Sequence, residues 1–248
     1  MRFPRIYLDQ DLGKALKERT AITFDDNAQR YVAQVLRLKP GTRITLFNGK
    51  GGEYRATLEQ VSRRKVTACL DNFEDRTIES ALDITLAQGI SRGERMDFTL
   101  QKATELGVRR IAPLVTERCG VHLNDERRSK RIQHWQGVIT AACQQSGRNT
   151  LPIIEPITPL TQWLPRDPAG PSLRLVLDPG ADHSIKSLPP PTAGIELLIG
   201  PEGGLEDSEI EMARRNGYQA VAVGPRILRT ETAGVAVLAI IQTLWGDI

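Results

Sequence analysis

The feature that most limits the fold of this chain is an alternation of strand-like and helix-like segments over its last two thirds. Five short apolar runs are typical of strands: DITLAQGI (83–90), RIAPLV (110–115), LRLVLD (173–178), IELLIG (195–200) and QAVAVG (219–224). Amphipathic or apolar stretches typical of helices cover residues 94–107, 125–147, 207–217 and 230–246. Such alternation predicts an α/β domain with a largely parallel sheet.

The first third of the chain has a different pattern. Short β-rich runs (RIYL, TRITLF, EYRATL and KVTACL) alternate with glycine-rich breaks, and one amphipathic stretch covers residues 25–39. The pair Asn48-Gly49 predicts a hairpin, because both residues tolerate a positive φ. We therefore predict a small β-barrel with one helix over residues 1–72, and an α/β domain over 73–248 that begins with a polar connector.

Charge and composition narrow the class of protein. The chain has 248 residues, enough for two modest domains. Residues 1–72 hold 14 Lys and Arg against 8 Asp and Glu, a net charge of +6, while the remainder holds 19 against 22, a net charge of −3. This asymmetry is typical of a nucleic-acid-binding module joined to a more neutral domain, although a solvated basic surface would give the same count.

Several classes of structure are not expected. The N-terminus has scattered charges and no apolar segment, and no stretch is long enough to span a bilayer, so we expect a cytoplasmic protein without a membrane anchor. Cys69, Cys119 and Cys143 are odd in number and widely spaced, which predicts free thiols. Cys119 and His122 lack a second pair at ligand spacing, so no metal is expected.

Loops of unusual composition follow three successive strands of the predicted sheet. They are LVLDPGADHS, IGPEGG and VGPRILRTETA, and in an open α/β sheet such strand ends form the ligand crevice. Gly200, Gly203 and Gly204 would let a ligand approach the main chain. Glycine and proline could instead serve only to turn the chain, but three such loops together favour a binding site.

The composition of the glycine loop limits the ligand. Neither a P-loop nor a dinucleotide-binding glycine pattern occurs in the chain. Glu202, Glu206, Asp207 and Glu209 would repel phosphate from the following helix, and part of this acidity would be structural if Ser208 and Glu211 formed a capping box. The pattern favours an adenosine-type ligand without phosphate.

Several motifs, in this order, resemble those of the RsmE family of ribosomal RNA methyltransferases, within the SPOUT class. They are RIY, VLRLKPGTRITLFNGKGGEY, RMDFTLQKATELGV, ERC, QQSGR, IGPEGG and GPRILRTETA, and they cover nearly the whole chain. The resemblance implies a PUA-like N-terminal barrel and a C-terminal α/β SPOUT domain with a trefoil knot and a homodimer interface. It also implies transfer of methyl from S-adenosylmethionine to N3 of a uridine in 16S ribosomal RNA of the small subunit.

The resemblance also implies which residues hold the cofactor, largely through their backbone. They are Leu177, Ile199, Gly200, Pro201, Gly203, Val223, Gly224, Arg226, Ile227, Leu228 and Thr230. Arg226 could instead brace its loop, and Thr230 could simply cap the last helix. The family commonly has Ser or Thr where this chain has Glu206, so we expect the helix cap to move to Asp207 or Ser208.

The chemistry of the implied reaction suggests catalytic candidates. Loss of the N3 proton from uracil gives an anion that a cationic donor would stabilise and whose proton a carboxylate could accept. Arg229, Glu231 and Glu105 are the candidates. Arg229 and Glu231 could instead form a local ion pair, and Glu105 could lie on a solvated helix face.

The RNA contacts are expected among arginine and lysine side chains. Arg2, Arg5, Arg30 and Arg37 lie in the basic first domain, and Lys102, Arg118 and Arg148 lie in the shared motifs, although any one of them could be an ordinary surface charge. Aromatic residues make up only 5% of the chain, which favours structured RNA, or RNA held within a ribosomal subunit, over a free single strand held by base stacking. A pseudouridine synthase lacks support, because no G-R-L-D-like segment occurs, and a non-catalytic RNA-binding protein remains an alternative.

The C-terminal stretch TAGVAVLAIIQTLWGDI is apolar on more than one helix face. Such a helix is expected to be buried on two sides, against its own sheet and against a partner. The sequence therefore predicts a homodimer.

Overall fold

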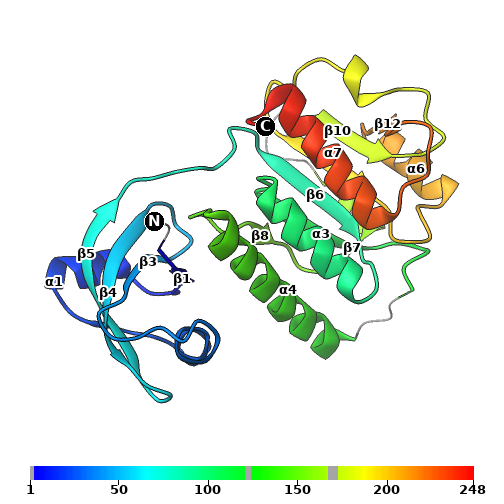
Figure 1. Ribbon diagram of the computed structural model, residues 1–248. Coiled ribbons are helices and arrows are strands. Elements are labelled where there is room, and N and C mark those ends of the chain that lie inside the picture. Colours follow the sequence, from blue (N-terminus) through cyan, green and yellow to red (C-terminus); the bar gives the residue numbers. More distant parts are fainter. Residues whose placement is uncertain (1–2, 121–123, 167–172) are drawn as a thin grey trace. The chain divides into compact units, whose positions relative to one another are not determined.

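The computed structural model describes residues 3–120, 124–166 and 173–248 and divides the chain into two compact units (Figure 1). The first unit comprises Met1–Glu79 and Cys143–Leu151, and the second comprises Ser80–Ala142 and Pro152–Ile248. A boundary after residue 72 would cut strand β5 (Val66–Glu74). The return of Cys143–Leu151 to the first unit was not predicted from the sequence.

The first unit is built on a five-stranded sheet in the order β1-β3-β4-β5-β2. Its other strands are β1 (Arg5–Tyr7), β2 (Ile22–Thr23), β3 (Arg43–Phe47) and β4 (Glu53–Val61). β3 and β4 form the antiparallel hairpin predicted at Asn48-Gly49, where Gly49 has a φ of +78°. Within the described residues β1 and β2 lie at opposite edges and do not pair, so the predicted barrel is an open, curved sheet.

The helices of the first unit differ from the single helix predicted over residues 25–39. That segment forms α2 (Asp26–Arg30) followed by one π-helical turn (Tyr31–Val35). A further helix, α1 (Leu12–Glu18), was not predicted; it has two turns, and Asp11 caps it by accepting from the backbone N–H of Lys14. Short elements of this kind carry too little periodicity to be recognised in a sequence.

A buried ion network joins the two chain segments of the first unit. Arg5 is only 8% exposed, pairs with the buried carboxylate of Glu53 and also bonds the side chain of Asn149. Arg148 is 3% exposed and donates to Glu79 over 2.9 Å. Burial alone would raise the pKa of the Glu53 carboxyl, but the hydrogen bond from Arg5 and three nearby arginine charges lower that pKa below its ordinary value.

The second unit contains a seven-stranded sheet in the order β12-β10-β11-β6-β7-β8, with β9 also paired to β7. The strands are β6 (Ile84–Gly89), β7 (Arg110–Val115), β8 (Ile153–Ile154), β9 (Thr158–Pro159), β10 (Leu173–Leu177), β11 (Ile195–Ile199) and β12 (Gln219–Val221). Every pairing is parallel, which confirms the predicted α/β sheet.

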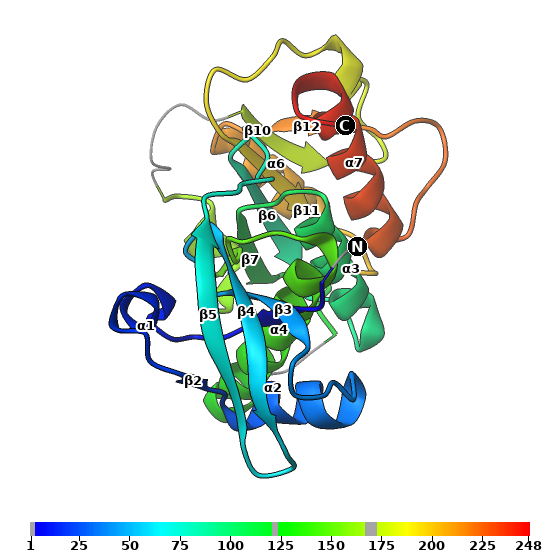
Figure 2. The same ribbon diagram turned by 60° about the vertical axis from the view of Figure 1, so that its left-hand side comes forward.

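Helices cover both faces of this sheet. The helices are α3 (Glu94–Glu105), α4 (Asp125–Ser146), α5 (Leu160–Trp163), α6 (Asp207–Arg215) and α7 (Thr230–Trp245), with a 3₁₀ turn at Ile185–Ser187. Figure 2 shows α6 on one side of β11 and α7 with α3 on the other. β11 is buried along its whole length, because a parallel sheet covered on both faces leaves no strand surface for water.

The sequence also predicted thiols without disulfides and no membrane-spanning stretch. Cys69, Cys119 and Cys143 form no disulfide within the described part of the chain, and burial raises the pKa of the Cys143 thiol to about 12. Among the described residues, no helix is long and apolar enough to cross a bilayer.

Candidate active site

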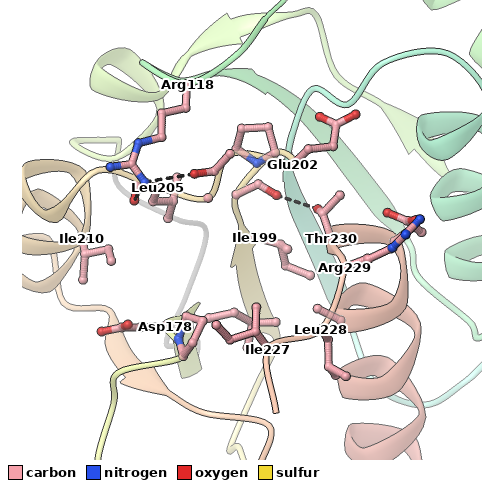
Figure 3. Close-up of a pocket in the computed structure, with 18 of the residues that line it drawn as sticks. Arg118, Asp178, Ile199, Glu202, Leu205, Ile210, Ile227, Leu228, Arg229 and Thr230 are labelled. Carbon is pink, nitrogen blue, oxygen red and sulfur yellow. Dashed lines mark hydrogen bonds between the residues drawn. The ribbon is translucent and has the colours of Figure 1, made fainter.

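The loops that follow β10 and β11 and the segment that leads into α7 line one cavity of about 670 Å³ (Figure 3). β12, β10 and β11 are neighbours in the sheet, so their carboxyl ends lie at one edge. The sequence predicted a crevice at these strand ends, and the structure confirms it. The volume falls within the range of about 300–1,000 Å³ that is usual for small-molecule sites.

The glycine loop after β11 folds closely upon itself. A Cβ on Gly200 would lie 2.8 Å from backbone atoms of Gly204 and Leu205, so only glycine fits there without moving the loop. Gly204 has a φ of +73°, which L-residues rarely adopt. A Cβ on Gly203 would lie 3.0 Å from the Cβ of Arg118, and its φ is not in the left-handed region. The left-handed position of this loop is therefore Gly204.

Gln88 and Thr230 hold the glycine loop from behind. The side-chain amide of Gln88, at the end of β6, donates to the Gly200 carbonyl over 3.2 Å and to the Thr230 hydroxyl over 3.1 Å. That hydroxyl donates to the same carbonyl over 2.6 Å, a bond visible in Figure 3. Arg229 is the N-cap of α7, so the suggestion that Thr230 caps this helix is wrong. The Thr230 hydroxyl instead bonds the first residue of α7 to the Gly200 carbonyl that follows β11.

Two ion pairs hold the loop from its outer side. Glu202 accepts from the backbone N–H of Arg92 over 2.8 Å and pairs with Arg95 over 3.0 Å. Burial would raise the pKa of Glu202, but these hydrogen bonds and the Arg95 charge lower it. Arg118 pairs with Glu206 over 2.7 Å. It also donates to the Gly203 carbonyl over 2.9 Å, a bond drawn in Figure 3. Arg118, predicted to bind RNA, therefore supports the loop.

Glu206 also begins helix α6. It is the N-cap, and its side chain and that of Glu209 form a reciprocal capping box. The predicted capping box of Ser208 and Glu211 is therefore wrong, as is the predicted shift of the cap to Asp207 or Ser208. A glutamate can replace Ser or Thr here because Glu209 three residues later bonds the cap backbone N–H over 2.9 Å.

Most residues predicted to contact the cofactor do line the cavity. They are Leu177, Ile199, Gly200, Pro201, Gly203, Ile227, Leu228 and Thr230. Figure 3 shows Ile199, Ile227 and Leu228 gathered at the middle of the cavity. Ile227 is 84% exposed, so its side chain is accessible to a ligand in the cavity.

Other lining residues differ from the prediction. Val223, Gly224 and Arg226 are not among the residues that line the cavity. Asp178, Leu205 and Ile210 line it without having been predicted. The position of Asp178 directly after a strand, before Pro179-Gly180, was a usable sequence signal.

Arg229 and Glu231 both line the cavity from the start of α7. The two side chains form no ion pair within the described part of the chain, so the alternative of a local pair is not observed. Arg229 is exposed, while the Oε2 atom of Glu231 is buried and has no hydrogen-bond partner among the described residues. An unpaired cation and an unsatisfied carboxylate thus lie at one end of the site.

Glu105 lies away from the cavity. It ends α3, whereas Arg95 in the first turn of the same helix lines the cavity. Ten residues of helix separate them by about 15 Å at 1.5 Å per residue. Glu105 pairs with Lys102 over 2.8 Å, so the prediction that Glu105 is catalytic is wrong for the cavity of its own chain, and Lys102 is engaged in that pair.

The predicted RNA contacts of the first unit separate into two groups. Arg5 and Arg148 are buried in ion pairs, so neither can reach a phosphate and these two predictions are wrong. Arg30 and Arg37 are exposed, and Arg37 has a φ of +51°. Arg2 lies outside the described residues, as does His122. No cluster of three or more metal-ligating side chains occurs among the residues that the structure describes.

Two protein-family models match the chain and identify the class of protein to which it belongs. The model of an RNA methyltransferase domain matches residues 78–242, which include the sheet and the cavity of the second unit. The model of an RNA methyltransferase PUA domain matches residues 24–68, within the first unit. The two units therefore correspond to an RNA methyltransferase domain and its PUA domain.

Individual relatives define the family. The chain is 32% identical over 247 residues to ribosomal RNA small subunit methyltransferase E of Buchnera aphidicola subsp. Schizaphis graminum, covering 100% of this chain and 98% of that protein. It is 26% identical over 243 residues to the Bacillus subtilis protein of the same name, covering 94% and 95%. The chain belongs to the ribosomal RNA small subunit methyltransferase E family.

Two solved structures are similar over their whole length. The Neisseria gonorrhoeae ribosomal RNA small subunit methyltransferase E, bound to S-adenosylmethionine, has a TM-score of 0.91 and 40% identity, with 100% of both chains covered. A Legionella pneumophila methyltransferase with the same bound cofactor has a TM-score of 0.94 and 36% identity, again with 100% of both chains covered.

Proposed function

We propose that this protein transfers a methyl group from S-adenosylmethionine to N3 of a specific uridine in 16S ribosomal RNA of the small subunit. The observation that carries the proposal is the cavity at the ends of β10, β11 and β12, whose wall is a glycine loop of exposed backbone, in a chain of this family.

The cavity suits this cofactor in shape and polarity. Ile199, Ile227 and Leu228 offer an apolar slot for the adenine ring, and the close-folded loop after Gly200 presents main-chain groups to it. Asp178 and Glu202 provide negative charge for a cationic ligand. The cofactor, when bound, supplies an electrophilic methyl group.

Arg229 and Glu231 are the proposed catalytic residues. Removal of the uracil N3 proton leaves negative charge on the ring oxygens, which the exposed guanidinium of Arg229 is placed to stabilise. Glu231 lines the cavity and its buried Oε2 has no hydrogen-bond partner among the described residues, so we assign this carboxylate as the acceptor of that proton. N3 then forms its bond to the methyl group as the sulfur–methyl bond breaks, which leaves N3-methyluridine, S-adenosylhomocysteine and a protonated Glu231 carboxyl.

The proposed function also includes the RNA contacts of the first unit and the assembly of the protein. Arg30 and Arg37 are exposed on the first unit and are proposed to contact RNA held in an assembled subunit in the cytoplasm. A homodimer through the C-terminal region and a trefoil knot in the second unit are also proposed. The dimer is supported by Leu244, an apolar residue that is 43% exposed at the end of the largely apolar helix α7. A sedimentation measurement giving a monomer at micromolar concentration would contradict the dimer.

The function is tested with purified protein and small ribosomal subunits from a strain that lacks this gene. We expect calorimetry to show binding of S-adenosylmethionine, and mapping to show one new N3-methyluridine that appears only with protein and cofactor together. If the protein bound the cofactor but methylated no RNA, the proposed methyl transfer would be contradicted and a non-catalytic role would be favoured. Pseudouridine in place of methyluridine would overturn the proposed reaction.

A further inference from the structure

The first turns of helix α4 carry a run of basic side chains, RRSKR at residues 127–131, that the cavity does not use. Asn124 caps this helix through the backbone N–H of Arg127. Asp125 and Glu126 in the first turn stabilise its start. The four basic residues that follow outnumber these two acids, so stabilisation of the helix start does not explain their presence.

Four basic residues lie along one side of the helix, where Arg131 is half-buried and the others are exposed. Arg127, Lys130, Arg131 and His134 are spaced at intervals of three and four, which places them side by side. Arg127 is exposed, and the side chains of Lys130 and His134 are 72% and 59% exposed. Arg128 is left out of this set because its Nε is buried, whereas Arg131 is half-buried one turn before the buried Trp135. We call Arg127, Lys130, Arg131 and His134 the α4 basic face.

Six of the other twelve arginines of the second unit are neutralised by a carboxylate. Arg95, Arg110, Arg118, Arg166, Arg214 and Arg215 all form ion pairs. Arg127 and Arg131, in contrast, form none with any described residue. On the same face Lys130 pairs with Glu126 over 2.7 Å, and His134 contacts Asp97 over 2.8 Å. The two arginines therefore keep their charge for an external anion.

The α4 basic face also lies toward the functional edge of the sheet. α4 is the helix that follows β7, and β7 runs parallel to β6 and its neighbour β11. The start of α4 is therefore near the carboxyl edge at which the cavity opens, and the intervening loop contains Arg118, which bonds the glycine loop. A polyanion bound at this face would run close to a nucleotide in the cavity.

We propose that the α4 basic face, through Arg127 and Arg131, binds the phosphate backbone of the substrate RNA next to the target uridine. The proposal rests on the proposed function and adds an RNA contact surface to the second unit. Two unpaired guanidinium groups about one helical turn apart suit successive phosphates, because each can form a bidentate contact.

The test combines Arg127→Gln with Arg131→Gln. The variant and the wild type are compared for binding to small ribosomal subunits from a strain lacking this gene, at several salt concentrations. The slope of log affinity against log salt should become shallower by about 1.4 for two lost contacts, at about 0.7 per phosphate of single-stranded nucleic acid. At physiological salt the KM for subunits should rise at least about tenfold, while kcat and calorimetric S-adenosylmethionine affinity stay unchanged.

The matched control combines Arg110→Gln with Arg215→Gln, which removes the same net charge from arginines already held in ion pairs. An unchanged slope in the α4 variant would overturn the proposal, and so would an equal change in the control, because that would indicate a general charge effect. If the wild type methylates nothing, the proposed function fails, yet the difference in slope between the two variants still decides the binding surface.

Discussion

Arginine has different roles in the two units. In the first unit, Arg5 and Arg148 are buried and paired with Glu53 and Glu79, where they join the segment at 143–151 to the sheet. In the second unit, Arg118 and Arg229 lie at the cavity with much of their side chains exposed. All four occur in motifs shared with the family or in its basic domain, so the sequence alone treats them alike.

The difference depends on the carboxylates placed around each guanidinium. A buried arginine is retained only where a carboxylate and further hydrogen bonds satisfy it, and the resulting pair is costly to break from one side. An exposed arginine can exchange its partner for a ligand at little cost. Arg5 and Arg148 thus hold the first unit together, whereas the exposed Arg229 at the cavity of the second unit stays available for chemistry.

The largest expected effect is on the stability of the first unit. Arg5→Met should destabilise it by about 3–5 kcal/mol, because Glu53 would remain buried without its main partner. Chemical denaturation followed by a probe in the first unit measures this. Arg5→Met combined with Glu53→Gln should recover much of the lost stability. If Arg5→Met alone were as stable as the wild type, the Arg5–Glu53 pair would not hold the first unit together.

The same pair predicts a dependence on pH. The pKa of Glu53 is lowered in the folded protein, so its stabilisation is present above the unfolded-state value of about 4.3 and is lost as the pH falls through the lower folded value. The wild type should therefore lose stability in that acid range. With Glu53→Gln this part of the acid dependence should disappear from the unfolding profile.

A large effect on catalysis is expected at the cavity. Arg229→Ala should lower methyl transfer by about 100-fold or more, as is usual when a donor to a developing anion is removed. Cofactor affinity and thermal stability should be unchanged, since Arg229 is exposed and unpaired within the described chain. Lost cofactor binding would instead assign Arg229 to the cofactor pocket.

A moderate effect is expected where the glycine loop is held from behind. Thr230→Val keeps the shape of the side chain but removes the hydroxyl between Gln88 and the Gly200 carbonyl. Calorimetry should show S-adenosylmethionine affinity reduced about tenfold, from a buried polar group left unsatisfied. Thr230→Ser should restore most of it, and kcat at saturating cofactor should fall less than the affinity. Equal losses in both variants would exclude the hydroxyl as the cause.

The smallest effect is expected at the outer support of the loop. Arg118→Gln removes an exposed pair with Glu206, and cofactor affinity should change by no more than about fivefold. A loss comparable to that of the threonine variant would show that the outer support is as important as the inner one.

The sequence predicted the second unit better than the first. Long periodic segments such as IELLIG and the helix over 94–107 were placed almost to the residue, because strands buried on both faces and amphipathic helices leave strong patterns. The short elements α1 and β2 leave none. The three strand-end loops of the cavity were also predictable, since parallel strands bring their carboxyl ends together.

Individual roles were less predictable, for a physical reason. Glu105 is on the same helix as Arg95, but only the length of that helix places it far from the cavity. Arg5 and Arg148 are identified as structural only when Glu53 and Glu79, distant in sequence, are seen beside them. Glu231 remains a candidate because the residue lines the cavity and its buried Oε2 has no hydrogen-bond partner among the described residues.

The discontinuous first unit has a consequence for synthesis on the ribosome. N-terminal domains generally fold first as the chain emerges. Here Arg5 and Asn149 belong to the same unit, so the N-terminal sheet cannot complete its buried network until residues 143–151 have left the exit tunnel. Until then Glu53 and Arg5 lack part of their final surroundings. A fragment ending at residue 79 would remain in that unfinished state, so the two units cannot be separated by a single cut.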